Sequence, residues 1–340
     1  MTTPRISLFL VPAALGDPAT EYASALAAVE RAEALGLDGF WIAEGQLSGI
    51  ATPSGLSFLA AATQRTRTIR LGTAVIPLAF SGPLQVAQTA AQVDWLADHR
   101  LELGVGKSNG GGFSAQAFAA HGLDEHDREA VYADALARLR ELLEGGGLPD
   151  DVGIYPATGT LRRRIWQATS SVATAIATGR AGDGLLLHRV VPGVPGADVG
   201  AVQRTLVDAY LDALPDGVEP RIGVSRVVVA ADSRDDALAA IDDDRSRRPH
   251  LLSADRTVER YVDDANLHVG TPDDVVRSLL ADPAASAATD VLATTVLDPA
   301  GDAFARSLEL LGTRVAPLLR STLADARRVT PQAIIASILR

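Results

Sequence analysis

An acidic residue and a carboxamide follow an apolar run near the start of the chain. Residues 39–43 read GFWIA, a composition that predicts a buried strand, and Glu44, Gly45 and Gln46 come directly after it. A carboxylate at the end of such a strand can order a pocket or take part in proton transfer. The side chain of Gln46 donates and accepts hydrogen bonds but cannot act as a general base.

A glycine-rich turn carries the single lysine of the chain. The sequence GVGKSNGGG spans Gly104–Gly112 after a predicted strand and contains Lys107. A Walker-type phosphate loop would need glycine at Leu101, and a dinucleotide fingerprint would need glycine at Asn109, so neither motif is present. Exposed backbone N–H groups beside one cation are typical of an anion site, and a plain flexible loop is the alternative.

A second candidate anion site lies at QATSSVATA, residues 167–175. A short predicted strand ends at Gln167, and Thr169 and Ser170 lead directly into a predicted helix. Hydroxyl groups and free N–H groups at the start of a helix favour phosphate. Ordinary capping of the helix by a hydroxyl side chain is the alternative.

Arg128 is the third candidate, because it stands in the first turn of a predicted helix. The helix dipole disfavours a cation at that end. A bound anion nearby would account for this arginine, and a solvated surface side chain is the alternative.

The sequence contains no motif typical of a metal site or of a serine hydrolase. Cysteine is absent, and the six histidines show no metal-ligand spacing. The segment GVSRV at 223–227 lacks the closing glycine of a nucleophile elbow. We therefore expect neither a metal site nor a hydrolase of that type.

The composition limits the possible partners. The 340 residues are 47% hydrophobic, enough for a large core, and the formal net charge is −11. This acidic balance predicts no nucleic-acid partner, because phosphate neutralisation needs clustered Lys and Arg. No run of about 18 apolar residues occurs, and the first residues lack a cationic segment with a cleavage site. We therefore expect a cytoplasmic protein with no membrane partner.

Strand-like and helix-like segments alternate along the chain in eight units. The predicted strands cover residues 5–11, 39–43, 69–76, 101–105, 164–167, 184–187, 222–230 and 290–296. The predicted helices cover residues 21–36, 53–65, 83–96, 128–143, 170–178, 202–213, 233–241 and 303–319. Such alternation predicts a parallel sheet with helices outside, and eight units favour a closed (β/α)8 TIM barrel over an open doubly wound sheet.

Three irregular segments leave predicted strand ends, at Lys107–Asp127, His188–Gly200 and Asp242–Asn266. In a barrel, the loops at the C-terminal face of the strands build the active site. We expect one barrel domain over residues 1–320. A C-terminal extension over 321–340, helical in pattern, is expected to dock on the barrel or on a second subunit.

Long stretches of the sequence resemble the bacterial luciferase-like family of flavin-dependent oxidoreductases. The matching segments are AEALGLDGFWIAE (32–44), RTIRLGTAVIPL (67–78), GPLQVAQTAAQVDWLADHRLELGVGKS (82–108), HGLDEHDREAVYADALARLRELL (121–143), VGTPDDVVRSL (269–279) and RSLELLGTRVAPLLR (306–320). They occur in the family's order, and the resemblance is thinner between residues 145 and 268.

The resemblance implies a β/α barrel that uses reduced FMN with dioxygen, or the deazaflavin coenzyme F420. In the family, the flavin phosphate is held by the loop after the fourth strand, the arginine opening the fourth helix and the turn after the fifth strand. The corresponding positions here are Gly106, Lys107, Arg128, Gln167, Thr169 and Ser170. The three weak anion candidates therefore fall where the family binds one phosphate.

The third predicted strand matches the family's bulged strand at Thr73, Ala74 and Val75. The resemblance implies a cis peptide bond between Ala74 and Val75 that presents backbone to the flavin ring. Small residues are needed there because the ring lies close.

The end of the second strand departs from the family, where a Glu is commonly followed by two histidines facing the flavin. This chain keeps Glu44 but has Gly45 and Gln46 in place of the imidazoles. Three explanations follow: the enzyme needs no imidazole base, His188 at the sixth strand tip supplies one, or the site is degenerate.

The family's chemistry implies a monooxygenase acting on a small organic substrate, with Glu44, Gln46 and His188 as candidate catalytic residues. A flavin reductase is the expected partner, because no nicotinamide-binding motif is visible. Members of the family often form dimers, so the resemblance also implies a homo-oligomer. Deazaflavin-dependent hydride transfer and a non-catalytic flavin-binding relative are the alternatives.

Overall fold

The structure, a computed structural model, describes residues 3–13, 16–47, 49–108, 113–149, 152–247 and 257–328. Within these ranges, eight parallel strands follow one another around a barrel: β1 (Arg5–Leu10), β2 (Gly39–Ile42), β3 (Arg70–Thr73), β5 (Leu101–Gly106), β6 (Ile165–Ala168), β7 (Gly184–Leu187), β8 (Ile222–Ala230) and β10 (Asp290–Thr294). The barrel closes because β10 pairs with both β8 and β1. The prediction of a closed TIM barrel is confirmed.

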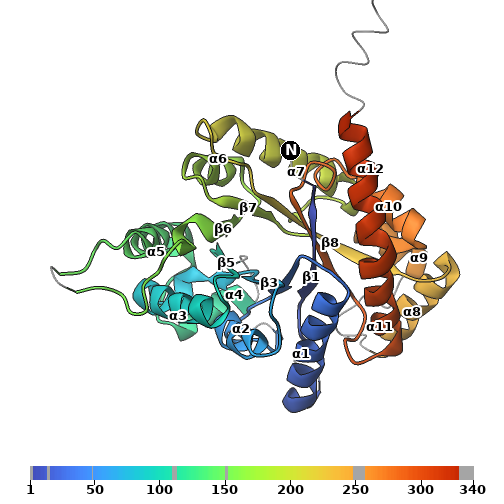
Figure 1. Cartoon of the computed structure of the whole chain (residues 1–340), viewed down its shortest axis with the longest axis horizontal. Coiled ribbons are helices and arrows are strands. Elements are labelled where there is room, and N and C mark those ends of the chain that lie inside the picture. The colour runs from blue at the N-terminus through green and yellow to red at the C-terminus, as the bar shows by residue number, and fades with distance from the viewer. Residues whose placement is uncertain are drawn as a thin grey trace, which may run out of the picture.

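Helices surround the strands (Figure 1). They include α1 (Pro18–Ala34), α2 (Gly55–Thr63), α3 (Pro83–Leu96), α5 (Arg128–Leu143), α6 (Val172–Arg180), α7 (Val199–Ala213), α8 (Arg234–Arg247), α10 (Pro272–Ala281), α11 (Asp302–Leu310) and α12 (Ala316–Arg328). Each buries one stripe of small or aliphatic side chains, as Ala87, Ala90 and Val93 do on α3.

The sequence pattern did not predict four short elements: α4 (Phe113–Ala120), α9 (Val258–Asp264), β9 (Leu267–Gly270) and α10. The first two lie inside segments that were expected to be irregular. β9 adds a strand beside the last four residues of β8, outside the barrel. Residues 109–112, 248–256 and 329–340, which belong to two of the expected loops and to the expected C-terminal extension, lie outside the described ranges.

The last helix crosses the expected end of the barrel domain at residue 320. A π-helical turn, Leu311–Val315, joins α11 to α12, and α12 continues to Arg328. Leu323 on this helix is buried in the main core. Among the described residues, no helix has the length and apolar character needed to cross a membrane.

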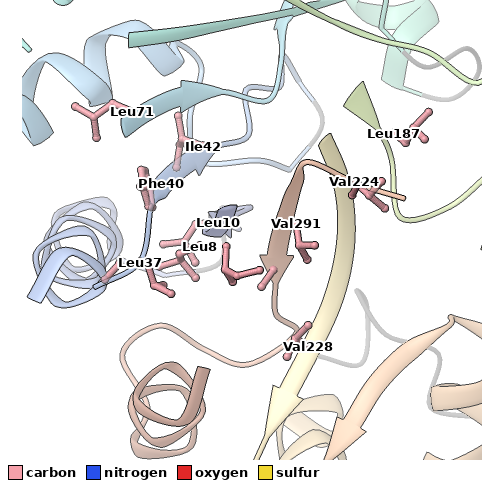
Figure 2. Packing of buried hydrophobic residues seen from close by; sticks show 14 of the residues in the cluster. Leu8, Leu10, Leu37, Phe40, Ile42, Leu71, Leu187, Val224, Val228 and Val291 are labelled. Atoms are coloured by element: carbon pink, nitrogen blue, oxygen red, sulfur yellow. The ribbon is translucent and has the colours of Figure 1, made fainter. Parts of the chain in front are cut away.

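Side-chain alternation along the strands sorts the core into two clusters. One packs between strands and helices, where Figure 2 shows Leu8, Leu37 and Phe40 lying close together. The other lies inside the barrel and contains Trp41 and Trp166.

Two indoles fill the middle of the barrel. The rings of Trp41 and Trp166 meet edge to face with centroids 5.5 Å apart. An added Cβ would lie 2.3 Å from the Trp41 ring at Gly72 and 2.4 Å from the Trp166 ring at Gly184, so glycine makes room for each ring. Two residues beyond each indole, Ala43 and Ala168 line a cavity at the C-terminal ends of the strands.

Candidate active site

A cavity of about 530 Å³ lies at the C-terminal ends of the barrel strands. This volume is within the usual range for small-molecule sites. Nine of the twelve predicted site residues line it: Glu44, Gln46, Ala74, Val75, Gly106, Lys107, Thr169, Ser170 and His188. The side chains of Thr73, Arg128 and Gln167 are not part of this lining.

The carboxylate of Glu44 reaches the cavity from the end of β2. Its Oε2 accepts a hydrogen bond of 2.7 Å from the backbone N–H of Gly55, the first residue of α2. Burial raises the pKa of Glu44 to about 7, although the Gly55 hydrogen bond opposes the rise. A carboxyl group with such a pKa can hold or release a proton near neutral pH.

An imidazole lies beside Gln46, but it comes from a residue that the sequence analysis did not select. Nε2 of His121 is 2.8 Å from Oε1 of Gln46. The His121 ring also stacks on Phe80, which lines the cavity, with centroids 5.0 Å apart and a 10° interplanar angle. In the sequence, 75 residues separate His121 from Gln46. No local pattern in the sequence links the two.

His188 lines the cavity just after β7. Burial, reinforced by the charge of Arg189, lowers the pKa of His188 to about 4, so the imidazole is neutral at pH 7. Its ring nitrogens lie near Val190 and Arg189, at 3.4 and 3.3 Å, and not near Gln46. Nε2 of His188 therefore accepts from Arg189, and its other ring nitrogen faces the Val190 backbone.

The predicted phosphate ligands are partly brought together. Lys107 and Ser170 line the same cavity. Nζ of Lys107 also forms an ion pair of 2.7 Å with Oε1 of Glu129, and an Arg128 nitrogen lies 3.9 Å from that oxygen. Nε of Arg128 is buried without a hydrogen-bond partner. Arg128 is thus connected to the Lys107 end of the cavity through the Glu129 carboxylate.

The turn after β6 combines a helix cap with a free hydroxyl. Ser171 caps α6 by accepting from the N–H of Thr174, and Thr169 accepts from the N–H of Ser171 at 3.0 Å. Ser171 is therefore the capping hydroxyl, and Thr169 closes a turn just before the cap. Ser170 is exposed and faces the cavity.

A bulge shapes the wall next to Gly106. β3 ends at Thr73, the Ala74–Val75 peptide bond is cis as expected, and β4 (Ile76–Pro77) resumes pairing with β5. The β3–β4 segment carries one residue more than the facing part of β5. An added Cβ on Gly106 would lie 2.6 Å from a methyl group of Val75. The wall is therefore made of backbone and small side chains in close contact.

The side chains of Thr73 and Gln167 form hydrogen bonds within the barrel and do not line the cavity. Oγ1 of Thr73 exchanges two hydrogen bonds with the Gly104 backbone, at 2.8 and 2.9 Å. Gln167 is buried and donates to Asp183 at 3.0 Å. Both side chains point into the strand network, so neither offers a free group to a ligand.

Comparison with known proteins places this geometry in a family. A model described as luciferase-like monooxygenase matches residues 5–290. The 4-hydroxyprotoasukamycin monooxygenase of Streptomyces nodosus subsp. asukaensis is 29% identical over 337 residues, covering 90% of this chain and 89% of that protein.

Solved structures share the fold at lower identity. The oxygenating constituent of 3,6-diketocamphane monooxygenase from Pseudomonas putida, in complex with FMN, has a TM-score of 0.74 at 18% identity, covering 93% of this chain and 98% of that one. The coenzyme F420 dependent tetrahydromethanopterin reductase of Methanopyrus kandleri has a TM-score of 0.66 at 17% identity, covering 94% of this chain and 100% of that one. The resemblance seen in the sequence is confirmed, and the chain belongs to the luciferase-like monooxygenase family of oxidoreductases.

Proposed function

We propose that this chain is a flavin-dependent monooxygenase that uses reduced FMN and dioxygen to oxidise a small organic substrate. The observation that carries the proposal is the sharing of one cavity by Lys107, Ser170 and the Ala74–Val75 wall. When bound there, reduced FMN would supply the electrons with which dioxygen is activated.

The residues present fit the shape and charge of FMN. Lys107 and the hydroxyl of Ser170 would hold the phosphate, since a cation and a hydroxyl at the start of α6 favour an anion. The backbone of Ala74 and Val75, packed against Gly106, would lie against the ring, because it leaves a wall without large side chains. The guanidinium of Arg128 lies near this end but is paired with Glu125 and Glu129, at 4.0 and 3.9 Å.

The chain's own groups would control protons and water. Glu44, with a pKa of about 7, would exchange a proton with substrate or solvent at its carboxyl oxygens. Gln46 would donate a hydrogen bond from its amide N–H group, while its oxygen contacts His121. Apolar residues such as Phe9, Val11 and Leu292 line the same cavity and would exclude water from it.

In this proposal a separate flavin reductase supplies reduced FMN, and the protein acts in the cytoplasm as a homo-oligomer. Adding an NADH-dependent flavin reductase to the purified protein should support substrate-dependent oxygen uptake. Light scattering of the purified protein gives its oligomeric state.

Similarity to a coenzyme F420 dependent reductase supports a second candidate, hydride transfer with a deazaflavin. Anaerobic titration with reduced FMN and with reduced F420 separates the two. We expect FMN to bind more tightly, and the Lys107→Ala variant to lose about 1–3 kcal/mol of that binding free energy. Tight binding of F420 without binding of FMN would reject the monooxygenase proposal.

The third possibility, flavin binding without catalysis, needs a kinetic test. Protein loaded with reduced FMN is mixed with dioxygen, and flavin oxidation is followed by absorbance. A rate different from that of free FMN supports an active site that controls the reaction. A rate equal to that in free solution supports a non-catalytic relative.

A further inference from the structure

Arg189 lines the same cavity and has no acidic partner. It follows His188 at the end of β7, and its side chain is partly buried. Among the described residues its guanidinium forms no ion pair, and Nη1 donates a hydrogen bond of 3.3 Å to Nε2 of His188. Among the described residues, the charge thus lies at the cavity beside the neutral imidazole of His188 and without a carboxylate partner.

Two other buried arginines of this protein are paired with a carboxylate. Arg226 binds both carboxylate oxygens of Asp282, at 2.7 and 3.1 Å. Arg164 binds both oxygens of Asp94, at 2.7 and 2.8 Å. Such pairing is the rule, because a charge removed from water is costly unless it is compensated. Arg221 also forms no ion pair among the described residues, but it donates to the Gly182 carbonyl oxygen and lies over the Trp166 ring. Arg189 differs because it lines the cavity where a ligand would bind.

The carboxylate of the cavity does not compensate Arg189. Glu44 forms its hydrogen bond with Gly55, and burial raises its pKa without an opposing effect from a cation. Burial lowers the pKa of the Arg189 guanidinium, and the phenol of Tyr261 opposes this shift. A guanidinium nonetheless remains charged at neutral pH. The missing negative charge is therefore left to a ligand.

The backbone that carries Arg189 is held in place. Gln203 on α7 donates to the carbonyl oxygen of His188 at 2.5 Å. The other end of Gln203 accepts from the buried guanidinium of Arg226 at 2.9 Å. The Arg226–Asp282 ion pair thus fixes the strand end next to Arg189, so the guanidinium is presented from a rigid support.

We infer that Arg189 is a specificity-determining residue and that the substrate is an organic acid with a carboxylate on an apolar body. The planar fork of a guanidinium matches the two oxygens of a carboxylate. Apolar neighbours in the lining, Leu187, Val190 and Pro192, suit the rest of such a molecule. This inference rests on the proposed function, which leaves Lys107 and Ser170 to the phosphate of FMN.

The test compares acids with their uncharged amides. The probes are octanoate with octanamide and 4-phenylbutanoate with 4-phenylbutanamide, each titrated calorimetrically into wild-type protein with and without FMN. We expect at least one acid to bind about 10- to 100-fold more tightly than its amide. Arg189→Gln should abolish the preference. Arg189→Lys keeps a charge without the fork and should retain a reduced preference.

A matched control is Arg163→Gln, because Arg163 is exposed and makes no side-chain contact among the described residues. It should keep the full preference. The inference is rejected if the acids bind no more tightly than the amides, including undetectable binding of both. It is also rejected if Arg189→Gln retains the preference, or weakens FMN binding instead. Failure of wild-type protein to bind FMN, with the acid preference intact, would reject only the proposed function.

Discussion

The carboxylate of Glu44 is tied to the first backbone N–H of α2, that of Gly55, by a hydrogen bond of 2.7 Å. The start of a helix favours the charged carboxylate, whereas burial favours the neutral acid. Burial dominates, since the pKa of Glu44 is raised to about 7. The buried strand β2 thus ends in a carboxyl group that can change its protonation state near neutral pH while keeping its position.

This pKa predicts a pH-dependent contribution to stability. The folded protein holds the Glu44 proton more tightly than the unfolded chain, where the pKa is near the ordinary 4.5. The resulting stabilisation is complete below about pH 4.5 and is lost as the pH rises through 7. We therefore expect the free energy of unfolding to fall, between these pH values, by up to about 3 kcal/mol relative to Glu44→Gln.

Urea denaturation of both proteins at several pH values measures this difference. Glu219→Gln is the control, because Glu219 is exposed on a connecting segment. It should follow the wild-type profile. Parallel profiles for wild type and Glu44→Gln would show that Glu44 has an ordinary pKa in the folded state.

Glu129 is predicted to compete with the cofactor phosphate. Its carboxylate forms the 2.7 Å ion pair with Lys107, and 62% of its side chain is exposed. A phosphate at Lys107 must displace this carboxylate, and the exposed side chain can rotate into water at little cost. Glu129→Gln should therefore tighten FMN binding several-fold, mainly at low ionic strength. Fluorescence titration at low and high salt measures the effect. Weaker binding in the variant would mean that Glu129 orders Lys107 for the ligand.

The sequence predicted the barrel because its signal is local and repeated. Apolar runs such as IGVSRVVVA, residues 222–230, and helices with regular apolar spacing each carry their own evidence. The short elements α4 and α9 carry less, since eight and seven residues give no clear period. Pairing partners such as Glu129 for Lys107 depend on residues far apart in the chain, so spacing cannot predict them.

In the candidate site, too, the sequence predicted the features that depend on local pattern and missed those that depend on distant residues. Positions at strand ends, including Glu44, Lys107 and His188, follow from the barrel once its strands are known. The contacts that α4 and the residues just after it make do not follow from the strand positions. Predicting them requires the three-dimensional path of the long segment between β5 and α5. His121 was missed for that reason, and Arg189 was missed because an unpaired charge is visible only when its surroundings are known.

The contacts of His121 predict how firmly α4 is held over the cavity. Ser114 and Ala117 of α4 line the cavity, and His121, just after this helix, bonds to Gln46 and stacks on Phe80. His121→Ala removes both contacts, whereas His121→Phe keeps the ring. We expect amide exchange in α4 to become roughly 10-fold faster in the first variant and less affected in the second. Hydrogen-exchange mass spectrometry measures this.

The matched control is His126→Ala, because His126 is exposed on the same segment and its ring makes no contact among the described residues. It should leave exchange in α4 unchanged. Equal exchange in His121→Ala and wild type would show that α4 is held by its buried residues, such as Phe118, without help from Gln46.

Substitution by alanine is expected to have different effects at two glycines of β5, destabilising the fold at Gly104 and weakening FMN binding at Gly106. A Cβ on Gly104 would lie 1.9 Å from the Thr73 carbonyl oxygen, which is backbone and cannot move aside, so Gly104→Ala should lower the melting temperature strongly. A Cβ on Gly106 would clash with a Val75 methyl group, at 2.6 Å, and would lie at ordinary contact distance from Cβ of Ala168, at 3.6 Å. Gly106→Ala should therefore fold but push Val75 into the cavity and weaken FMN binding. Adding Val75→Ala to Gly106→Ala removes the clash and should recover much of that binding. Calorimetry and FMN titration of the three variants check this, and unchanged FMN affinity in Gly106→Ala would show that the ring does not lie against this wall.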